Sequence, residues 1–550
     1  MKQESIKLYI TGMTCEHCAI GIEKLLTQKK GIAKVSVSYP DATCECSFDP
    51  AETSKEEIIQ TINATKNYRV KEDFAKAPRP DRHMYDLIII GGGSAAFSAA
   101  IKAESLGLKT LMVNAGPDFG GTCVNVGCVP SKFLIRAGEA AYHASHSNFT
   151  GIRPKGVDID FAQIIKEKKK LVNELQQKKY LDVVKDFRHL TMLKGWATFK
   201  DAHTVEVNGN EYKALKFLIA TGSSTNIPSI EGLADTGYLT NDTLFDLEEK
   251  PESMTILGAG YIGLEIATAY SRLGVKVRII EFTGRVLRSQ TPDISEVLEM
   301  EMKKEGIEIL PDFRVVKFEK KGNDTIIHCK QPDGGIVQIV ENVKIVVATG
   351  RKPNTGQAGL EKIGLSLTPS GHIAVNDKLE TGIPHIYAAG DVANTPAFVY
   401  TAAYEGKVAV ENAFTGANIR VDYSSLPWVV FTDPQVAGAG LDEIEAANRN
   451  IPYEVSKLPL TEVPRSITAN NTRGFIKLIK NSETGHLIGA RVVASEGGEI
   501  IQLLSMAIKY KIPVKDLAGN LYPYLTLSEG IKLAALAFEK DVSKLSCCAG

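Results

Sequence analysis

Two glycine-rich segments, each directly after an apolar run, constrain the fold of this 550-residue chain most strongly. Leu87–Ile90 leads into Gly91-Gly-Gly93-Ser-Ala-Ala96, and Thr255–Leu257 leads into Gly258-Ala-Gly260-Tyr-Ile-Gly263. A continuous apolar run predicts a buried parallel strand. The glycines after it permit a tight turn into a helix whose N-terminal N–H groups bind a pyrophosphate. One such segment is weak evidence, but two predict an α/β chain with two Rossmann-like dinucleotide-binding domains.

The second strand of such a domain ends in an acidic residue, about 20 positions after the glycine-rich loop. This residue binds a ribose hydroxyl. Glu281 fits this pattern for the second loop, whereas the matching position of the first loop is Asn114. The Asn114 amide either binds the ribose or is a simple turn residue. Glu281 favours NADH, but Arg285 and Arg288 follow it, and both can hold the 2′-phosphate of NADPH.

Composition excludes several classes of protein. Lys plus Arg is 64 and Asp plus Glu is 65, so the net charge of −1 argues against a nucleic-acid binder and against an electrostatic membrane binder. The longest uncharged run, residues 87–101, is shorter than the ~20 residues that span a bilayer. The N-terminus lacks the apolar segment of a signal peptide. We therefore predict a cytoplasmic protein without membrane insertion.

Close pairing is the notable property of the nine cysteines. Disulfides are rare in the cytoplasm, so close pairs there indicate metal capture or redox chemistry. Eight of the cysteines form four close pairs, and Cys329 stands alone. The pairs are Cys15/Cys18, Cys44/Cys46, Cys123/Cys128 and Cys547/Cys548.

Residues 1–70 predict a small ferredoxin-like βαββαβ domain, and the charged segment 71–84 with its two prolines predicts a linker. The strands and helices are expected, in order, at Ile6–Ile10, Ile20–Leu26, Ala33–Tyr39, Cys44–Phe48, Lys55–Ile62 and Tyr68–Val70. Alternation puts Cys44 and Cys46 on one face of a strand. They are interpreted as buried packing residues, with auxiliary metal-binding thiols as the alternative.

The segment Gly120-Gly-Thr-Cys123-Val-Asn-Val-Gly-Cys128-Val-Pro-Ser-Lys132 resembles the redox-active disulfide motif of the pyridine nucleotide-disulfide oxidoreductases. Further family turns are matched by Ala220-Thr221-Gly222, Ala348-Thr-Gly350 and Tyr387-Ala-Ala-Gly390-Asp391. The resemblance covers residues 85–545. It implies an FAD-binding domain (85–245 and 376–420), an NAD(P)-binding domain (246–375) and an α+β dimerisation domain (421–545).

The resemblance also implies roles for single residues. Cys128 is the thiolate that faces the flavin, and Cys123 is the thiol that exchanges with substrate. A helix start near this pair lowers a thiol pKa. Lys132 pairs with Glu265 near the flavin; the alternative is an ordinary solvated ion pair. Tyr261 covers the nicotinamide pocket. The implied FAD-binding residues are Gly91, Gly93, Ala96, Asn114, Gly121, Thr122, Lys132, Ala220, Thr221, Gly222 and Asp391. The implied NADP-binding residues are Gly258, Gly260, Tyr261, Gly263, Glu281, Arg285 and Gly350.

Two further motifs indicate a thiophilic metal. Gly12-Met-Thr-Cys15-Glu-His-Cys18 resembles the metal-binding loop of heavy-metal-associated domains, in which two thiolates hold Cu(I) or Hg(II). A thioredoxin-type redox motif is the alternative, and His17 is expected to be a surface residue. The tail 546–550 carries adjacent Cys547 and Cys548, which suit a soft metal ion unless the tail is incidental.

The C-terminal segment decides between branches of the family. Most members carry a His-Glu pair that moves protons during disulfide exchange. Here Tyr524 occupies the histidine position before Glu529, and a phenol of pKa ~10 is a poor base.

Together these motifs resemble the mercury-reducing branch of the family, which implies NADPH-dependent reduction of thiol-bound Hg(II) to Hg(0) through FAD. The implied metal contacts are Tyr524, Tyr180 in the Glu174–Tyr180 segment, and the cysteines at 15, 18, 123, 128, 547 and 548. For the two tyrosines, the alternative is an ordinary packing role. A homodimer is expected in which each tail serves the neighbouring subunit, with a mercury transport protein as a donor partner. A dihydrolipoamide- or glutathione-type reductase and a metal-sequestering flavoprotein are the alternatives.

Overall fold

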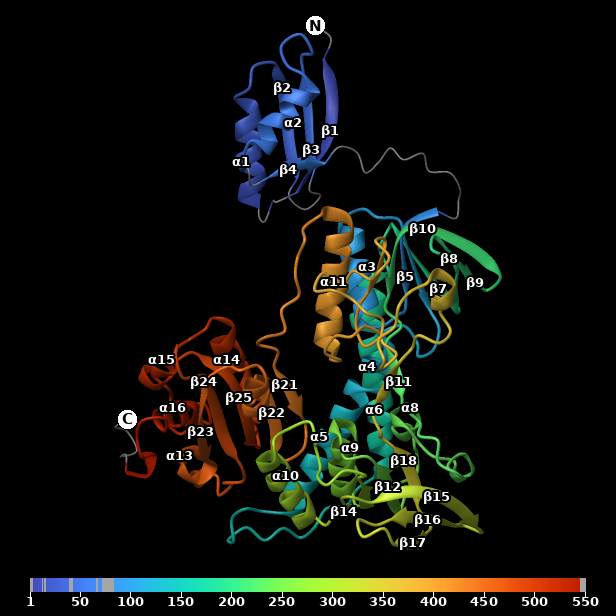
Figure 1. The fold of residues 1–550 in the computed structure, drawn as a ribbon, viewed down its shortest axis with the longest axis vertical. Coiled ribbons are helices and arrows are strands. Elements are labelled where there is room, and N and C mark those ends of the chain that lie inside the picture. Colours follow the sequence, from blue (N-terminus) through green and yellow to red (C-terminus); the bar gives the residue numbers. More distant parts are fainter. Residues whose placement is uncertain are drawn as a thin grey trace. The chain divides into compact units, whose positions relative to one another are not determined.

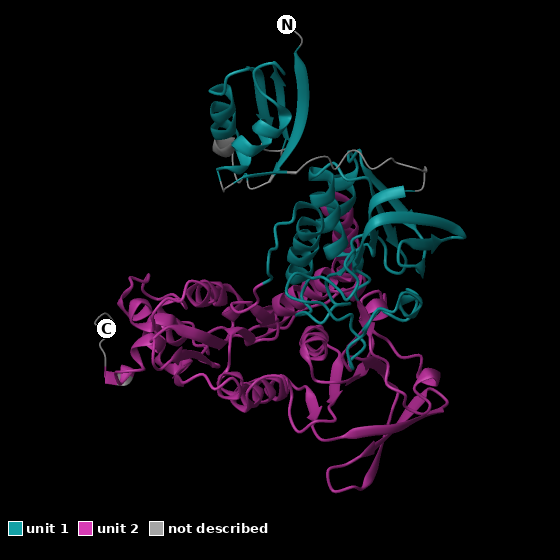
Figure 2. Cartoon of the chain, turned by 45° about the horizontal axis from the view of Figure 1, so that its top comes forward, with its two compact units in different colours: residues 1–121, 180–222, 353–421 teal, residues 122–179, 223–352, 422–550 magenta. Residues whose placement is uncertain are grey.

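The computed structural model describes residues 3–11, 13, 16–38, 43–65, 68–71 and 84–544 (Figure 1). Most of the predicted linker, Cys15 and the predicted Cys547-Cys548 tail lie outside the described residues. Two compact units make up the chain (Figure 2). The first comprises residues 1–121, 180–222 and 353–421, and the second comprises residues 122–179, 223–352 and 422–550.

The first unit begins with a four-stranded antiparallel sheet and two helices. The sheet order is β2-β3-β1-β4, and α1 and α2 pack together against the sheet through Ile22 and Ile58. This is the predicted βαββαβ arrangement. Its elements are β1 (Glu4–Thr11), α1 (Glu16–Thr27), β2 (Ile32–Ser38), β3 (Thr43–Phe48), α2 (Lys55–Asn63) and β4 (Arg69–Lys71).

The rest of the first unit is built on a seven-stranded sheet of order β7-β6-β5-β10-β9-β8, with β20 beside β10. The strands β7, β6, β5, β10 and β20 are parallel to their neighbours in this run, as βα connections require. The bounds are β5 (Met84–Ile90), β6 (Thr110–Asn114), β7 (Leu190–Lys194), β8 (Ala197–Asp201), β9 (Thr204–Val207), β10 (Asn210–Ile219) and β20 (Ile386–Ala388).

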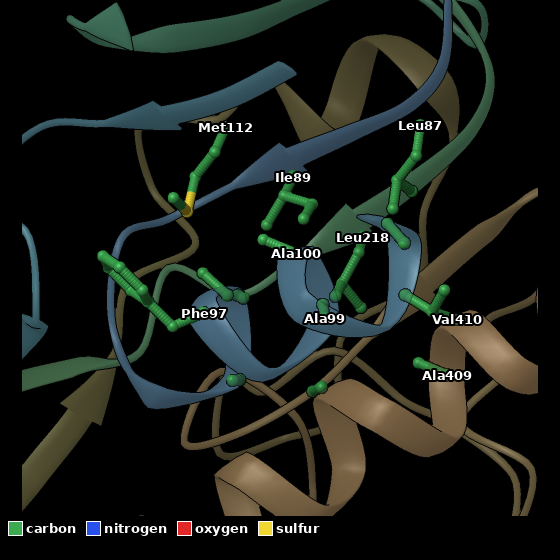
Figure 3. Close-up of a cluster of buried hydrophobic side chains, with 14 of the residues drawn as sticks. Leu87, Ile89, Phe97, Ala99, Ala100, Met112, Leu218, Ala409 and Val410 are labelled. Carbon is green, nitrogen blue, oxygen red and sulfur yellow. The ribbon is translucent and has the colours of Figure 1, made fainter. Parts of the chain in front are cut away.

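Two helices cover one face of this sheet, α3 (Ser94–Ser105) and α11 (Val399–Thr415), and they pack side by side (Figure 3). Ile89 of β5 and Leu218 of β10 meet Ala99 of α3 and Val410 of α11 in one buried cluster. The small alanines of α3 let the helix lie close to the sheet. The start of α3, directly after the first glycine segment, is thereby fixed.

The second unit contains a parallel sheet of order β14-β13-β12-β18 and an antiparallel meander β15-β16-β17. The strands are β12 (Ser253–Leu257), β13 (Lys276–Ile280), β14 (Glu308–Leu310), β15 (Arg314–Lys321), β16 (Asp324–Lys330), β17 (Ile336–Glu341) and β18 (Lys344–Val347). The main helices are α5 (Cys128–Ser145), α6 (Phe161–Gln176), α9 (Tyr261–Arg272) and α10 (Pro292–Lys304). Helices α5 and α9 pack against each other, and their contact positions the thiol pair described below.

The second unit ends in a five-stranded antiparallel sheet, β21-β22-β25-β24-β23, whose core includes residues of α14 and α16. The bounds are β21 (Trp428–Val430), β22 (Gln435–Gly440), β23 (Tyr453–Pro459), β24 (Phe475–Asn481), β25 (Leu487–Ala494), α12 (Glu443–Asn448), α13 (Pro464–Thr468), α14 (Gly497–Lys509), α15 (Val514–Gly519) and α16 (Glu529–Leu536).

The predicted fold class is confirmed: two Rossmann-like sheets, an α+β C-terminal domain and a ferredoxin-like N-terminal domain. The domain limits given above stay a prediction. Within the described residues, no helix combines the length and apolar character that crossing a membrane requires.

Candidate functional site

The two predicted glycine loops each press against the end of a neighbouring strand. Gly91 has φ +131°, and a Cβ added there would lie 2.1 Å from the Ala220 carbonyl oxygen. Gly258 has φ +104°, and its Cβ would lie 2.6 Å from the Ala348 carbonyl oxygen. A side chain fits at neither position. Both Ala-Thr-Gly turns predicted from the resemblance therefore lie against the glycine loop of their own sheet.

The other predicted flavin residues of the first unit gather around the start of α3. Gly93 precedes the helix, and the Gly121 backbone passes close to it. Asn114 is buried at the end of β6, where its Nδ2 donates to the Pro117 carbonyl at 2.8 Å. Thr221 Oγ1 donates to the Asn354 carbonyl at 2.8 Å, which ties two loops of this unit together. Asp391 is half-buried after β20.

Tyr180, a predicted metal contact, lies in a π-turn, Gln177–Leu181, that follows α6. Its ring packs edge-on against Phe97 of α3, with 5.0 Å between the ring centroids. Its hydroxyl lies 3.5 Å from Ser94 Oγ, at the start of α3. The π-turn thus directs this phenol to the glycine loop of the first unit, and its part in metal binding stays a prediction.

The thiol pair begins helix α5. Cys128 is the first residue of α5, and Cys123 lies in the short helix α4 (Gly121–Val126) before it; both are half-buried free thiols. A hydrogen bond from Cys123, aided by the charge of Lys132, lowers the pKa of Cys128 to about 7. The same hydrogen bond, together with burial, raises the pKa of Cys123. Cys128 is therefore the thiolate of the pair near neutral pH, and Cys123 is the proton-bearing partner.

An ion pair stands beside the thiols. Lys132, one helical turn after Cys128, places its Nζ 2.6 Å from Glu265 Oε2 on α9. The Glu265 side chain is only 8% exposed, so this is not a solvated surface pair. Phe431 completes the arrangement: its backbone N–H donates to Glu265 Oε1 at 3.0 Å, and its ring lies under Lys132 Nζ at 4.7 Å.

The end of β13 forms the second candidate nucleotide contact. The Glu281 carboxylate is buried, and it accepts hydrogen bonds from the Ala259 backbone N–H at 2.7 Å and from Thr283 N–H and Oγ1 at 2.8 Å. The residues that follow Glu281 line an open hollow: Phe282, Thr283, Gly284, Arg285 and Arg288. Among the residues that the structure describes, none is a hydrogen-bond partner of the buried Arg285 Nε.

The remaining predicted metal residues are placed only in part. Cys18 belongs to α1, although its side chain, Cys15, Cys547 and Cys548 lie outside the described residues. Tyr524 is 48% exposed in the loop before α16, where Glu529 accepts the Leu525 backbone N–H at 3.1 Å.

The Cys44 and Cys46 side chains lie in the core of the N-terminal domain, in agreement with the packing interpretation. Burial raises the pKa of the Cys44 thiol to about 12.

Comparison with known proteins supports one family. A profile described as pyridine nucleotide-disulphide oxidoreductase matches residues 85–406, and the dimerisation domain of that family matches residues 426–535. This chain belongs to the pyridine nucleotide-disulphide oxidoreductase family. A heavy-metal-associated domain profile matches residues 7–69 of this oxidoreductase.

Individual members of the family, and solved structures, are also similar to this chain. The oxidoreductase is 40% identical to a mercuric reductase of Lysinibacillus sphaericus over 99% of both chains. It is 38% identical to a mercuric reductase of Staphylococcus aureus over 100% of both. Among solved structures, it resembles the Cu(II) complex of an HOCl-induced flavoprotein disulfide reductase, RclA, of Escherichia coli. That match has a TM-score of 0.74 and 25% identity, and covers 83% of this chain and 100% of the other.

The family implies FAD and a nicotinamide nucleotide, and the loops of this oxidoreductase fit both. Gly91 and Gly258 bring each loop tightly against its sheet, as argued above. By contrast, a Cβ at Gly260, just before α9, or at Gly222 would meet no atom of the described residues within 4 Å. The turns are therefore closed toward the protein and open on the side from which a phosphate can reach the helix N-terminus.

Some residues of this site escaped the sequence analysis. Phe431 supports the Lys132–Glu265 pair, and Trp428 stacks on Tyr261, yet both lie more than 160 residues from these partners. No local pattern reports a contact at that separation. The only sequence signal is that both residues are aromatic and fall in one short apolar stretch.

Proposed function

We propose that this oxidoreductase reduces thiol-bound Hg(II) to Hg(0) with electrons from NADPH. The observation that carries the proposal is the thiol pair at the start of α5, in which Cys128 has a pKa of about 7. A thiolate and a neighbouring thiol are strong ligands for a soft divalent ion. No histidine follows His486 in the sequence, so the C-terminal part lacks the proton carrier that ordinary disulfide reduction uses.

The residues of the chain divide the work as follows. Cys123 and Cys128 take the Hg(II) ion by exchange with the thiolates that deliver it, so the ion keeps two sulfur ligands throughout. Lys132 stabilises the Cys128 thiolate, and Glu265 holds Lys132 in place. Tyr524 and Tyr180 contact the metal as phenols. When bound, FAD supplies the transfer of an electron pair from the nicotinamide nucleotide to the thiol site, and two electrons convert Hg(II) to Hg(0).

The preference for NADPH over NADH is also proposed. The Glu281 carboxylate already accepts three hydrogen bonds from its own loop, which compensate its charge and leave it poorly available to a ribose hydroxyl. Arg285 and Arg288 line the adjoining hollow with Phe282. Two guanidinium groups beside the end of β13 suit a 2′-phosphate.

Assembly and location complete the proposal. We infer a homodimer in which Cys547 and Cys548 hand Hg(II) to the neighbouring subunit. The N-terminal domain holds Hg(II) on Cys15 and Cys18, delivered by a mercury transport protein. A cytoplasmic location agrees with the need for NADPH and for reduced thiols.

The test is NADPH oxidation at 340 nm by flavin-loaded protein, with Hg(II) in excess small thiol and with collection of headspace Hg(0). Glutathione disulfide and lipoamide serve as parallel substrates, and NADH replaces NADPH in a second series. We expect mercury-dependent oxidation with volatile Hg(0) and a higher kcat/KM for NADPH. Turnover of a disulfide without Hg(0) would contradict the proposal and favour an ordinary disulfide reductase.

A further inference from the structure

Tyr261, the first residue of α9, stacks on an aromatic side chain of the C-terminal sheet. Its ring lies 5.8 Å from the Trp428 ring between centroids, with only 20° between the ring planes. Gln290 Nε2 donates to the Tyr261 hydroxyl at 3.4 Å. Both ends of the phenol side chain are therefore held, the ring by Trp428 and the hydroxyl by Gln290.

Trp428 itself is held firmly. It is 9% exposed on β21 and pairs with Gly438 on β22. A Cβ at Gly438 would lie 2.3 Å from Trp428 Cζ2, so the indole rests directly on the backbone of its neighbour strand. The Arg491 guanidinium lies over the indole, 5.5 Å from the ring centroid, in cation–π geometry.

Arg491 joins the two contacts into one network. It is 2% exposed, and its Nε donates to Gln290 Oε1 at 3.0 Å while Nη1 donates to the Ala490 carbonyl at 2.9 Å. Asp442 and Glu445 face its other end at 3.6 and 3.5 Å. The same buried cation thus braces Trp428 and the amide that contacts the Tyr261 hydroxyl.

We propose that Trp428 is a positioning residue that holds Tyr261 in its closed position, and that the nicotinamide nucleotide must break this stack to bind. The inference rests on the proposed function and on the role that the family resemblance implies for Tyr261, as cover of the nicotinamide pocket. An aromatic pair of this kind is strong enough to weaken nucleotide binding about two- to tenfold. The environment of the Trp428 indole would then change when the nucleotide occupies the pocket.

The chain offers a direct optical test, because Trp196 and Trp428 are its only tryptophans. In the Trp196→Phe variant of the flavin-loaded protein, all tryptophan emission comes from Trp428. Trp196 is 59% exposed and outside the site, so this background retains activity. We expect NADP⁺, which does not absorb at the emission wavelength, to change the emission saturably, with the Kd that calorimetry gives for NADP⁺. The double variant Trp196→Phe/Tyr261→Leu should lose this change.

Kinetics give the second readout. Trp428→Leu should lower the KM for NADPH and the Kd for NADP⁺ about two- to tenfold with little change in kcat, and Trp428→Phe, which keeps a ring, should do so less. If Trp428→Leu does not fold, Trp428→Phe and the emission titration still decide. An unchanged emission at saturating NADP⁺, or unaltered nucleotide affinity in the Trp428 variants, overturns the inference. The Tyr261→Leu variant distinguishes failure of the Trp428 inference from failure of the cover role of Tyr261. If Tyr261→Leu also leaves nucleotide affinity unaltered, the cover role itself fails.

Discussion

Lys132 and Glu265 act on the pKa of the Cys128 thiol in opposite directions. The lysine charge lowers that pKa and the glutamate charge raises it. Lys132→Met should therefore raise the pKa of Cys128 above its value of about 7, by roughly one pH unit, and Glu265→Gln should lower it. The thiolate is present above this pKa and is lost as the pH falls through it. The measurement is the alkylation rate of Cys128 in the reduced protein between pH 5 and 10, followed by mass spectrometry.

The control for this pair of variants is Lys169→Met, which removes an exposed lysine bound to Glu248. It should leave the pH midpoint of Cys128 alkylation unchanged. If the pKa of Cys128 shifted in the same direction in Lys132→Met and Glu265→Gln, the electrostatic account would be contradicted. Disturbed packing, rather than charge, would then set this pKa.

Single residues also mark the limit of what the sequence predicts. The motif around Cys123 and Cys128 identifies the thiols and Lys132, since their spacing is local. The support of Glu265 by the Phe431 N–H is not predictable, because it depends on how the C-terminal sheet packs near α9. Tyr180 shows the same limit: nothing in its short segment indicates the π-turn or the ring contact with Phe97 that the structure shows there.

The strand-to-helix turn is the element in which sequence and function are most tightly linked. Gly91→Ala would force a Cβ against the Ala220 carbonyl, and Gly258→Ala would do the same against Ala348. We expect Gly91→Ala to lower bound flavin per chain at least about fivefold, since it distorts the loop under the flavin diphosphate. Gly258→Ala should keep its flavin but raise the KM for NADPH at least about tenfold.

Flavin absorbance per protein and NADPH kinetics check these two variants. Gly151→Ala is the matched control, because a Cβ there meets no atom of the described part of the chain within 4 Å and the φ of Gly151 is not positive. It should change neither quantity. Loss of flavin from the Gly258 variant alone would reverse the assignment of the two loops.

Elements with a strong local pattern were predictable, and those fixed by distant packing were not. The apolar runs before the glycines became β5 and β12, and alternation in residues 44–48 became β3 with both thiols in the core. The antiparallel meander β15-β16-β17 has no comparable signature. Its outer strands β15 and β17 mostly alternate half-buried and exposed residues. The buried side chains Ile327 and Cys329 of the middle strand β16 pack in one cluster with distant neighbours such as Leu233.

At the scale of the whole molecule, the C-terminal domain exposes apolar side chains on one helix. Leu503, Met506 and Tyr510 recur at helical spacing on and just after α14, and all are exposed by more than a third. The residues lie within the region matched by the dimerisation domain. An apolar stripe of this kind is typical of a subunit interface, and we propose that it belongs to the interface of the proposed homodimer.

Subunit complementation tests whether the tail serves its neighbour. Co-expression of a Cys547→Ala/Cys548→Ala chain with a Cys123→Ala/Cys128→Ala chain creates heterodimers with one intact thiol pair and one intact tail on different subunits. If the tail acts on the partner, these heterodimers regain up to half of the wild-type mercury reduction per dimer at limiting Hg(II), while each homodimer stays slow. No recovery, in heterodimers verified by two affinity tags, would place each tail in its own subunit.

The burial of the spare cysteines has a toxicological consequence. The substrate of a mercury-reducing enzyme, Hg(II), is also a general enzyme inhibitor, because it binds any accessible thiolate. Cys44 and Cys329 are fully buried, and burial raises the pKa of their thiols to about 12 and about 11, so both thiols stay protonated at pH 7. We therefore expect Hg(II) to react with the cysteines that exchange it before it reaches these two buried thiols.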